Sequence, residues 1–209
     1  MSTKKMHYFT PIGTFNYPWL DKPSKWDASA RDGKGGSKPA DPTDLNGSYS
    51  VKLTVDPAVF KTSDFKKQID ELWDLAQKTN KGKYDETKDP YWADDEGNVC
   101  LTARRQAAFQ KDGKIQTMRP KLEDCTGRDI TKYVEEEGIQ VASESTGRLD
   151  VTTYVPVPKK KDGVATLRMN FDLVKAQFKV LKRYEADKSM APIDGGSPVG
   201  EELGEAIPY

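Results

Sequence analysis

Strict alternation of apolar and polar residues predicts a strand over residues 48–55, SYSVKLTV. One face of this strand would carry Tyr49, Val51, Leu53 and Val55, and the other would carry Ser48, Ser50, Lys52 and Thr54. Successive side chains of a strand point to opposite faces of the sheet. We therefore expect a half-buried strand in this segment.

The stretch SDFKKQIDELWDLAQK has its apolar residues at the spacing of a helix. They are Phe65, Ile69, Leu72, Trp73 and Ala76. Ser63 or Thr62 precedes them, and either hydroxyl can accept a hydrogen bond from an amide of the first helical turn. The pattern predicts one amphipathic helix, followed by a loop over NKGKYDETKDPYWADDEGN, which is polar and contains Pro and Gly.

Four further segments have the pattern of strands: residues 99–110, 114–122, 148–157 and 164–173. The last of them would bury Ala165, Leu167, Met169, Phe171 and Leu173. The residues that follow, VKAQFKVLKRY, would either extend this strand past a bulge or turn helical, and their periodicity fits both. Five strands and one helix predict a mainly β domain.

Aromatic residues are concentrated near the N-terminus, in HYFTPIGTFNYPWLDKPSKW. The rings are those of Tyr8, Phe9, Phe15, Tyr17, Trp19 and Trp26, and Pro11, Pro18 and Pro23 lie between them. Proline removes a backbone donor and restricts the residue before it, so these prolines exclude a helix and favour an extended segment along the sheet. We expect most of the rings in the core and one or two in a groove.

The dipeptide Asp112-Gly113 lies between two of the predicted strands and favours a hairpin with a type I′ turn. A two-residue loop there would pair residues whose numbers sum to 225, so that Arg104 lies opposite Lys121 and Gln106 opposite Arg119. The other face would carry Leu101, Ala103, Ala107, Phe109, Met118 and Leu122 toward the core. Arg105 falls on that apolar face, and we expect it to reach an edge or pair with a carboxylate.

This hairpin would have one basic face. Like charges directly opposite each other destabilise a strand pair by roughly 0.2–1 kcal/mol, so Arg104 and Lys121 would favour an anion between them. A phosphate backbone would supply that anion. The alternative is a solvated face whose lysines and arginines serve only solubility.

Two more basic segments and an outward tyrosine extend this surface. Lys159, Lys160 and Lys161 would lie in the loop between the fourth and fifth strands, Arg168 would lie on the polar face of the fifth, and Tyr154 would lie on the polar side of the fourth. Proteins that bind single-stranded DNA stack bases on aromatic rings and place cations along the backbone. A merely half-covered tyrosine is the alternative. The DNA-binding candidates are Arg104, Lys111, Lys114, Arg119, Lys121, Tyr154, Lys159, Lys160, Lys161 and Arg168.

Length and composition narrow the class of protein. The chain has 209 residues, of which 35% are hydrophobic, enough for one domain with a core and further non-core segments. We see no membrane-spanning run and no signal peptide, and so expect a cytoplasmic protein. Cys100, Cys125 and the single His7 have no ligand spacing, so we expect neither a metal nor a cofactor.

The net charge is zero for the whole chain but is unevenly distributed. Residues 186–209 contain five carboxylates and one lysine, a net charge of −4, so residues 1–185 carry +4. The stretch DGGSPVGEELG is rich in Gly, Pro and Ser, and we expect a disordered acidic tail over 186–209 beside a folded domain over 1–185. Such a tail would compete with an anionic partner for the basic domain, or would serve only as a solubilising terminus.

Several of these stretches together resemble a known family. FTPIGTFNYPWLDKP, GSYSVKLTV with its helix, PYWADDEGN, RRQAAFQKDGK, KVLKRYE and the acidic tail with a terminal aromatic residue are similar to the bacteriophage single-stranded DNA-binding proteins of replication and recombination. The resemblance implies a five-stranded OB-fold barrel with an inserted helix and a DNA-binding groove across the sheet. It also implies that the tail contacts the phage polymerase and helicase or primase in the host cytoplasm, through Glu201, Glu202, Glu205 and Tyr209. A homodimer is a further implication.

Other functions remain open from the sequence. A structural or virion β-barrel or β-sandwich protein would need no basic face. A metal-dependent nuclease could use the carboxylates of ADDEGN and YVEEEG, but neighbouring acids on a turn or a short helix point in different directions. We therefore expect a protein that is not an enzyme. Nothing in the strands excludes binding to duplex DNA as well.

Overall fold

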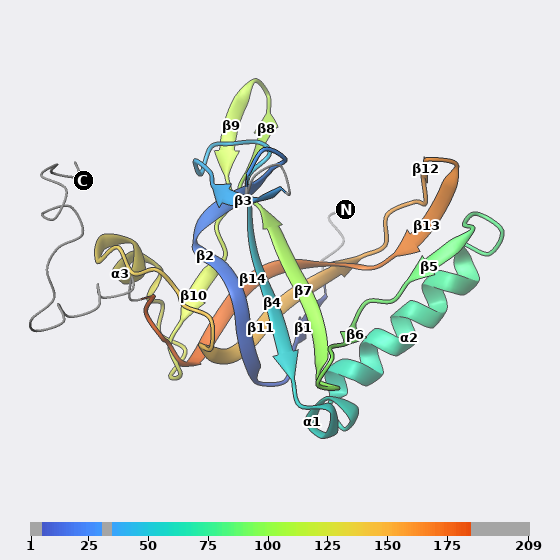
Figure 1. Ribbon diagram of the computed structural model, residues 1–209, viewed down its shortest axis with the longest axis horizontal. Helices are drawn as coiled ribbons and strands as arrows, with labels where there is room; N and C mark the ends of the chain where they lie inside the picture. Colours follow the sequence, from blue (N-terminus) through green and yellow to red (C-terminus); the bar gives the residue numbers. More distant parts are fainter. Residues whose placement is uncertain (1–5, 31–34, 185–209) are drawn as a thin grey trace, which may run out of the picture.

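The computed structural model describes residues 6–30 and 35–184. The predicted acidic tail, 186–209, lies outside the described residues. Figure 1 shows a twisted, mainly β molecule with α2 and α3 on opposite sides of the central strands. Among the described residues, no helix is long and apolar enough to cross a membrane.

Five strands form a closed ring at the centre (Figure 1). In ring order they are β2 (Gly13–Asp27), β4 (Ser48–Val55), β7 (Val99–Gln106), β14 (Asn170–Val180) and β11 (Thr146–Tyr154). Neighbours are antiparallel except β7 and β14, which are parallel. A closed five-stranded arrangement is that of the predicted OB-fold, and it confirms the mainly β fold class.

The ring closes where β11 meets β2, and two glycines make this contact possible. Gly147 lies opposite Gly13 in the antiparallel pairing. A Cβ atom on Gly147 would lie 2.1 Å from the carbonyl oxygen of Gln177, and one on Gly13 would lie 2.4 Å from that of Thr54. A side chain at Gly147 would push β11 away from β14, and one at Gly13 would push β2 away from β4, so both glycines are needed where the ring closes.

Shorter strands extend the ring. β1 (His7–Phe9) pairs with β11, β3 (Gly36–Pro39) with β2, β6 (Trp92–Ala93) with β7, and β10 (Lys121–Glu123) with β14. A separate sheet contains β5 (Glu86–Lys88), β12 (Lys160–Lys161) and β13 (Val164–Arg168), and a hairpin of β8 (Ala108–Lys111) and β9 (Lys114–Thr117) projects beyond the end of β7 (Figure 1).

The alternating segments became strands, but the predicted strands 99–110, 114–122 and 164–173 are each split in two. The apolar face of β4 is buried, and all five predicted core residues between Ala165 and Leu173 are buried as well. Of the two structures left open for VKAQFKVLKRY, the strand is observed for its first seven residues, because β14 continues to Val180 and no further. Phe178 at that end packs edge-on against Phe15, with ring centroids 5.5 Å apart. Each such buried side chain contributes about 1.5–3 kcal/mol to stability.

The predicted amphipathic helix is α2 (Asp64–Thr79), which is capped by Ser63, whose Oγ accepts from the Lys66 amide at 3.2 Å. The buried face of α2 packs against the five-stranded ring, because the side chain of Phe65 contacts that of Phe171 on β14. Their aromatic ring centroids are 5.9 Å apart. Two further helices were not predicted. They are α1 (Pro57–Lys61), which precedes α2, and α3 (Thr131–Glu136), which buries Val134.

The expectation that most N-terminal rings lie in the core is wrong, because only two of the six are buried. Tyr8 and Phe15 are buried, and Trp19 is partly exposed. Phe9, Tyr17 and Trp26 are exposed. The prolines do favour an extended segment, since residues 13–27 form the 15-residue strand β2, but its register with β4 shifts twice around Pro18 and Pro23. These irregularities break the simple alternation on which the core prediction depended.

The predicted hairpin forms only at its tip. Asp112 and Gly113 have φ angles of 51° and 74°, as a type I′ turn requires, and Ala108 pairs with Thr117. Below the tip the register ends, and the predicted pairs Arg104 with Lys121 and Gln106 with Arg119 are wrong. Both edges of β7 are occupied, because Arg104 pairs with Ser50 of β4 and Asp172 of β14. Pro120 also lacks the amide that a continued ladder would need.

Candidate nucleic-acid interface

A groove of about 660 Å³ lies on the outer face of the sheet, and we call it the Arg104 groove. Residues from β7, β11, β13, β14 and the segment around β6 line it. Its cations are Lys88, Arg104 and Arg168, its exposed rings are Trp92 and Tyr154, and its carboxylates are Asp89 and Asp172. Three of the predicted DNA-binding residues, Arg104, Tyr154 and Arg168, are therefore brought together.

Strand register explains how residues distant in sequence meet in this groove. Arg104 of β7 lies beside Asp172 of β14, and Asn170 of β14 lies beside Tyr154 of β11. Because side chains alternate along a strand, these positions share the outward face. The Tyr154 ring is 54% exposed there, so a planar ligand can reach it.

Trp92 is a groove residue that the sequence did not indicate. It lies on β6, opposite Cys100 of β7, and its ring is 43% exposed. The Lys52 ammonium lies 5.9 Å from the centre of this ring, which adds a cation beside it. The segment around Trp92 is polar and irregular and gives no periodic face. A large ring within a segment rich in Asp, Glu and Lys was the available signal.

The two guanidinium groups of the groove are available for an anion. Among the described residues, neither Arg104 nor Arg168 has a hydrogen bond or ion pair to a side chain. Asp172 faces a third arginine, because its Oδ2 lies 4.0 Å from Nη1 of Arg105. The same Nη1 donates to the carbonyl oxygen of Leu173 at 3.1 Å. The expected pairing of Arg105 with a carboxylate is therefore confirmed.

Arg119 and Lys121 lie away from the Arg104 groove and already contact carboxylates. Arg119 is 2.8 Å from Glu135 of α3 and donates to the carbonyl oxygen of Asp21 at 2.9 Å. Lys121 is 3.2 Å from Glu123, and the hydrogen bond to this carboxylate is the main cause that raises the pKa of Lys121. A phosphate at either cation would have to displace its carboxylate.

The remaining predicted cations lie on two projecting hairpins. Lys111 and Lys114 are directly opposite each other beside the turn of the β8–β9 hairpin. Lys160 and Lys161 form β12, so the predicted loop is instead a hairpin whose turn residues Asp162 and Gly163 have φ angles of 52° and 86°. The chain enters this second hairpin after Tyr154 and returns at Arg168. Both residues line the Arg104 groove, so the exposed lysines 159–161 extend from its rim.

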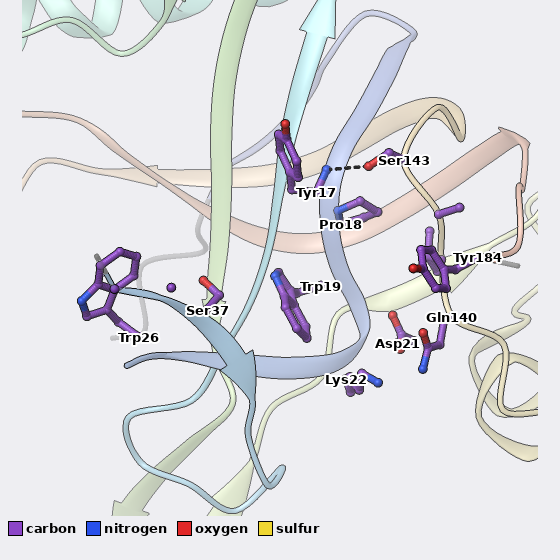
Figure 2. Close-up of a pocket in the computed structure, with 14 residues that line it drawn as sticks. Tyr17, Pro18, Trp19, Asp21, Lys22, Trp26, Ser37, Gln140, Ser143 and Tyr184 are labelled. Carbon is purple, nitrogen blue, oxygen red and sulfur yellow. Dashed lines mark hydrogen bonds between the residues drawn. The ribbon is translucent and has the colours of Figure 1, made fainter. Parts of the chain in front are cut away.

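A second groove, also of about 660 Å³, lies along β2, and we call it the Trp19 groove. Figure 2 shows Trp19 between Trp26 on one side and Tyr184 on the other, with Tyr17 farther along the strand. Asp21 and Lys22 also line it. Burial raises the pKa of the Asp21 carboxyl above its usual range. We expected one or two N-terminal aromatic rings in a groove, and three of them, Tyr17, Trp19 and Trp26, line this one.

The carboxylate clusters have structural partners. Asp94 accepts hydrogen bonds from the amides of Glu96 and Asn98 and closes a turn. Glu135 of the second cluster contacts Arg119. Within residues 6–30 and 35–184, no group of three or more His, Cys, Asp or Glu side chains is arranged to hold a metal ion.

Comparison with known proteins shows the fold. No protein-family model matches the chain, and no curated protein matches its sequence. Among solved structures, it is similar to gp2.5, a single-stranded DNA-binding protein encoded by bacteriophage T7, with a TM-score of 0.61 and 16% identity over 93% of this chain and 98% of that one. It is also similar to the single-stranded DNA-binding protein from bacteriophage Enc34, with a TM-score of 0.51 and 15% identity over 91% of this chain and 94% of that one.

Proposed function

We propose that this chain binds single-stranded DNA in the Arg104 groove. The observation that carries the proposal is the meeting of two exposed rings and two unpaired guanidinium groups in one groove, supplied by strands distant in sequence. The shared fold with two phage single-stranded DNA-binding proteins supports it. We also propose a role in phage DNA replication and recombination, which the resemblance of the sequence to that family supports.

Each kind of residue has a separate role in binding. Bases stack on Tyr154 and Trp92, a contact that every base can make, so binding is independent of sequence. Phosphates pair with Arg104, Arg168 and Lys88 through charge-assisted hydrogen bonds. The lysines of the β12–β13 hairpin continue the positive surface beyond the groove. A paired duplex hides its base faces, so the two rings favour a single strand.

Titration of oligothymidine and of duplex DNA, each at two salt concentrations, tests the proposal. We expect Arg104→Ala and Tyr154→Ala to weaken oligothymidine binding. Matched controls are Arg128→Ala and Tyr133→Ala, which remove an exposed arginine and an exposed tyrosine outside the groove. Equal loss in the controls, or equal affinity for duplex DNA in the wild type, would contradict the proposal.

We also propose that the acidic tail recruits a replication partner, a phage polymerase or helicase. The residues concerned are Glu201, Glu202, Glu205 and Tyr209. An aromatic side chain fills an apolar pocket on a partner, and the carboxylates speed encounter with a basic rim. Co-purification of the full chain with the cognate polymerase or helicase is the measurement.

A further inference from the structure

The Trp19 groove displays aromatic rings that the Arg104 groove does not use. Tyr17 is 79% exposed, Trp26 is 69% exposed and Tyr184 is 61% exposed. Such rings are usually at least partly covered in a folded protein, and a cluster of exposed ones marks a binding surface. Their common location in one groove (Figure 2) therefore calls for a ligand with flat apolar faces.

The backbone at Tyr17 is shaped to present its ring. Tyr17 has a φ of 49°, a left-handed conformation that residues other than glycine rarely adopt. It lies in the register shift between Asn16 and Trp19, and its amide donates to Ser143 Oγ at 3.1 Å. A bulge of this kind redirects a side chain. The backbone of Tyr17 is held in an unfavourable conformation while its ring points outward, so this residue serves no role in the core.

Trp26 is also held in place. A Cβ atom on Gly35 would lie 2.3 Å from Cζ2 of Trp26, so only a glycine lets this ring lie against the backbone. The next residue, Asp27, contacts Lys38 of β3 at 2.6 Å, and this hydrogen bond is the main reason that the pKa of Asp27 lies well below its usual range. The exposed indole is therefore positioned in advance, which reduces the entropy lost on binding.

The Trp19 groove and the Arg104 groove share one face of the sheet. Trp19 pairs with Ser50, and Ser50 pairs with Arg104, so the three residues form one outward row across β2, β4 and β7. Only the small side chain of Ser50 lies between the other two. Two interstrand spacings amount to about 10 Å, so one DNA strand can reach from one groove to the other.

The charges in the Trp19 groove favour bases over phosphates. Its charged lining residues are Lys22 and Asp21, one of each sign. A groove with balanced charge and several rings suits stacking, whereas the two free guanidinium groups of the Arg104 groove suit the backbone. We propose that the Trp19 groove is a second base-stacking subsite for the same DNA strand that occupies the Arg104 groove. This inference rests on the proposed function.

Oligothymidines of two lengths separate the two subsites. The short one has about two nucleotides: its phosphate favours the Arg104 groove, and it is too short to reach across the about 10 Å to Trp19. The long one has about 16 nucleotides, the upper limit of the site sizes known for OB-folds. The variants are Trp26→Ala and Tyr17→Asn, because asparagine tolerates the left-handed backbone without a ring. Phe9→Ala removes an exposed ring that lies in neither groove and serves as the control.

We expect each groove variant to bind the long oligonucleotide about 5- to 150-fold more weakly, which corresponds to 1–3 kcal/mol per stacked base. Binding of the short oligonucleotide should be unchanged, as should both affinities in Phe9→Ala. Trp26→Phe should also lose part of the tryptophan quenching caused by the long oligonucleotide. This second readout does not depend on a change in affinity.

The inference would be overturned if Trp26→Ala and Tyr17→Asn bound the long oligonucleotide with wild-type affinity. The exposed rings of the Trp19 groove would then indicate a protein ligand. Equal losses for both lengths would also overturn it, because the rings would then act through the fold. Arg104→Ala tests the proposed function separately. If it weakens the short oligonucleotide while the ring variants change nothing, only the second subsite is refuted. If it has no effect, the Arg104 groove itself is refuted.

Discussion

For the proposed DNA binding, the salt dependence of affinity would measure how many phosphates the Arg104 groove neutralises. The groove contains three cations, Lys88, Arg104 and Arg168. Each phosphate contact on a single strand contributes about −0.7 to the slope of log K against log salt, so the groove alone predicts a slope of about −2. Between about 50 and 200 mM salt this slope weakens binding about 18-fold.

Arg104→Ala should reduce this slope by about 0.7, so the same change in salt would weaken binding only about 7-fold. Arg104→Ala with Arg168→Ala should remove about 1.4 from the slope. Tyr154→Ala should lower affinity at every salt concentration, by about 1–3 kcal/mol if its ring stacks on one base, without changing the slope. The difference arises because phosphate contacts release counterions and stacking does not.

The assay is a fluorescence titration with oligothymidine, in which Trp92 reports directly from the groove. Lys121→Ala is an informative comparison, because Glu123 and Asp129 already contact this lysine. We expect its slope to be closer to that of the wild type. Unchanged slopes in both arginine variants would refute the assignment of phosphates to this groove. A slope that changes in Tyr154→Ala would show that the ring does not act by stacking.

Three further predictions concern the fold and the tail. Gly147→Ala should lower the denaturation midpoint sharply, because its Cβ would lie 2.1 Å from the Gln177 carbonyl oxygen; a wild-type midpoint by urea denaturation would contradict the account of ring closure. Burial raises the pKa of the Asp21 carboxyl above its usual value of 3.8, so this carboxyl stabilises the fold below that pH and loses its contribution as pH rises through the folded pKa. Asp21→Asn should therefore raise the urea midpoint at neutral pH but not at pH values below 3.8, and the reverse order would be inconsistent with a desolvated carboxylate. Tyr209→Ala should leave oligothymidine affinity unchanged and abolish co-purification with the polymerase or helicase. Tyr209→Phe should retain co-purification. Normal recovery of the partner with Tyr209→Ala would mean that the tail acts only through its negative charge.

Local chemistry was enough to predict several elements from the sequence. The alternation in SYSVKLTV, the helical spacing after Ser63 and the Asp112-Gly113 turn all formed as expected. Each depends on residues within one strand, one helix or one turn. The outward direction of Tyr154 also followed, because alternation along a single strand fixes it.

Pairing between distant segments could not be predicted in this way. The sequence suggested that Arg104 lies opposite Lys121, since a hairpin continued from its turn is the simplest arrangement. In the structure, β4 and β14 occupy both edges of β7, and Lys121 joins β14 through β10. A strand has only two edges, and local patterning does not state which segments compete for them. That competition decided which cations share a groove.

The sequence by itself determined that this chain is a mainly β protein with one long amphipathic helix. The spacing of apolar residues that distinguishes a strand from a helix is visible within each short segment of sequence. Only the tertiary structure decided that Arg104, Arg168, Tyr154 and Trp92 line one groove and that Tyr17, Trp19 and Trp26 line another. The physical reason is that the Arg104 groove depends on the pairing of β7, β14 and β11, and the Trp19 groove on the bulges of β2. These features arise from contacts between strands far apart in the chain and leave no periodic signal in it.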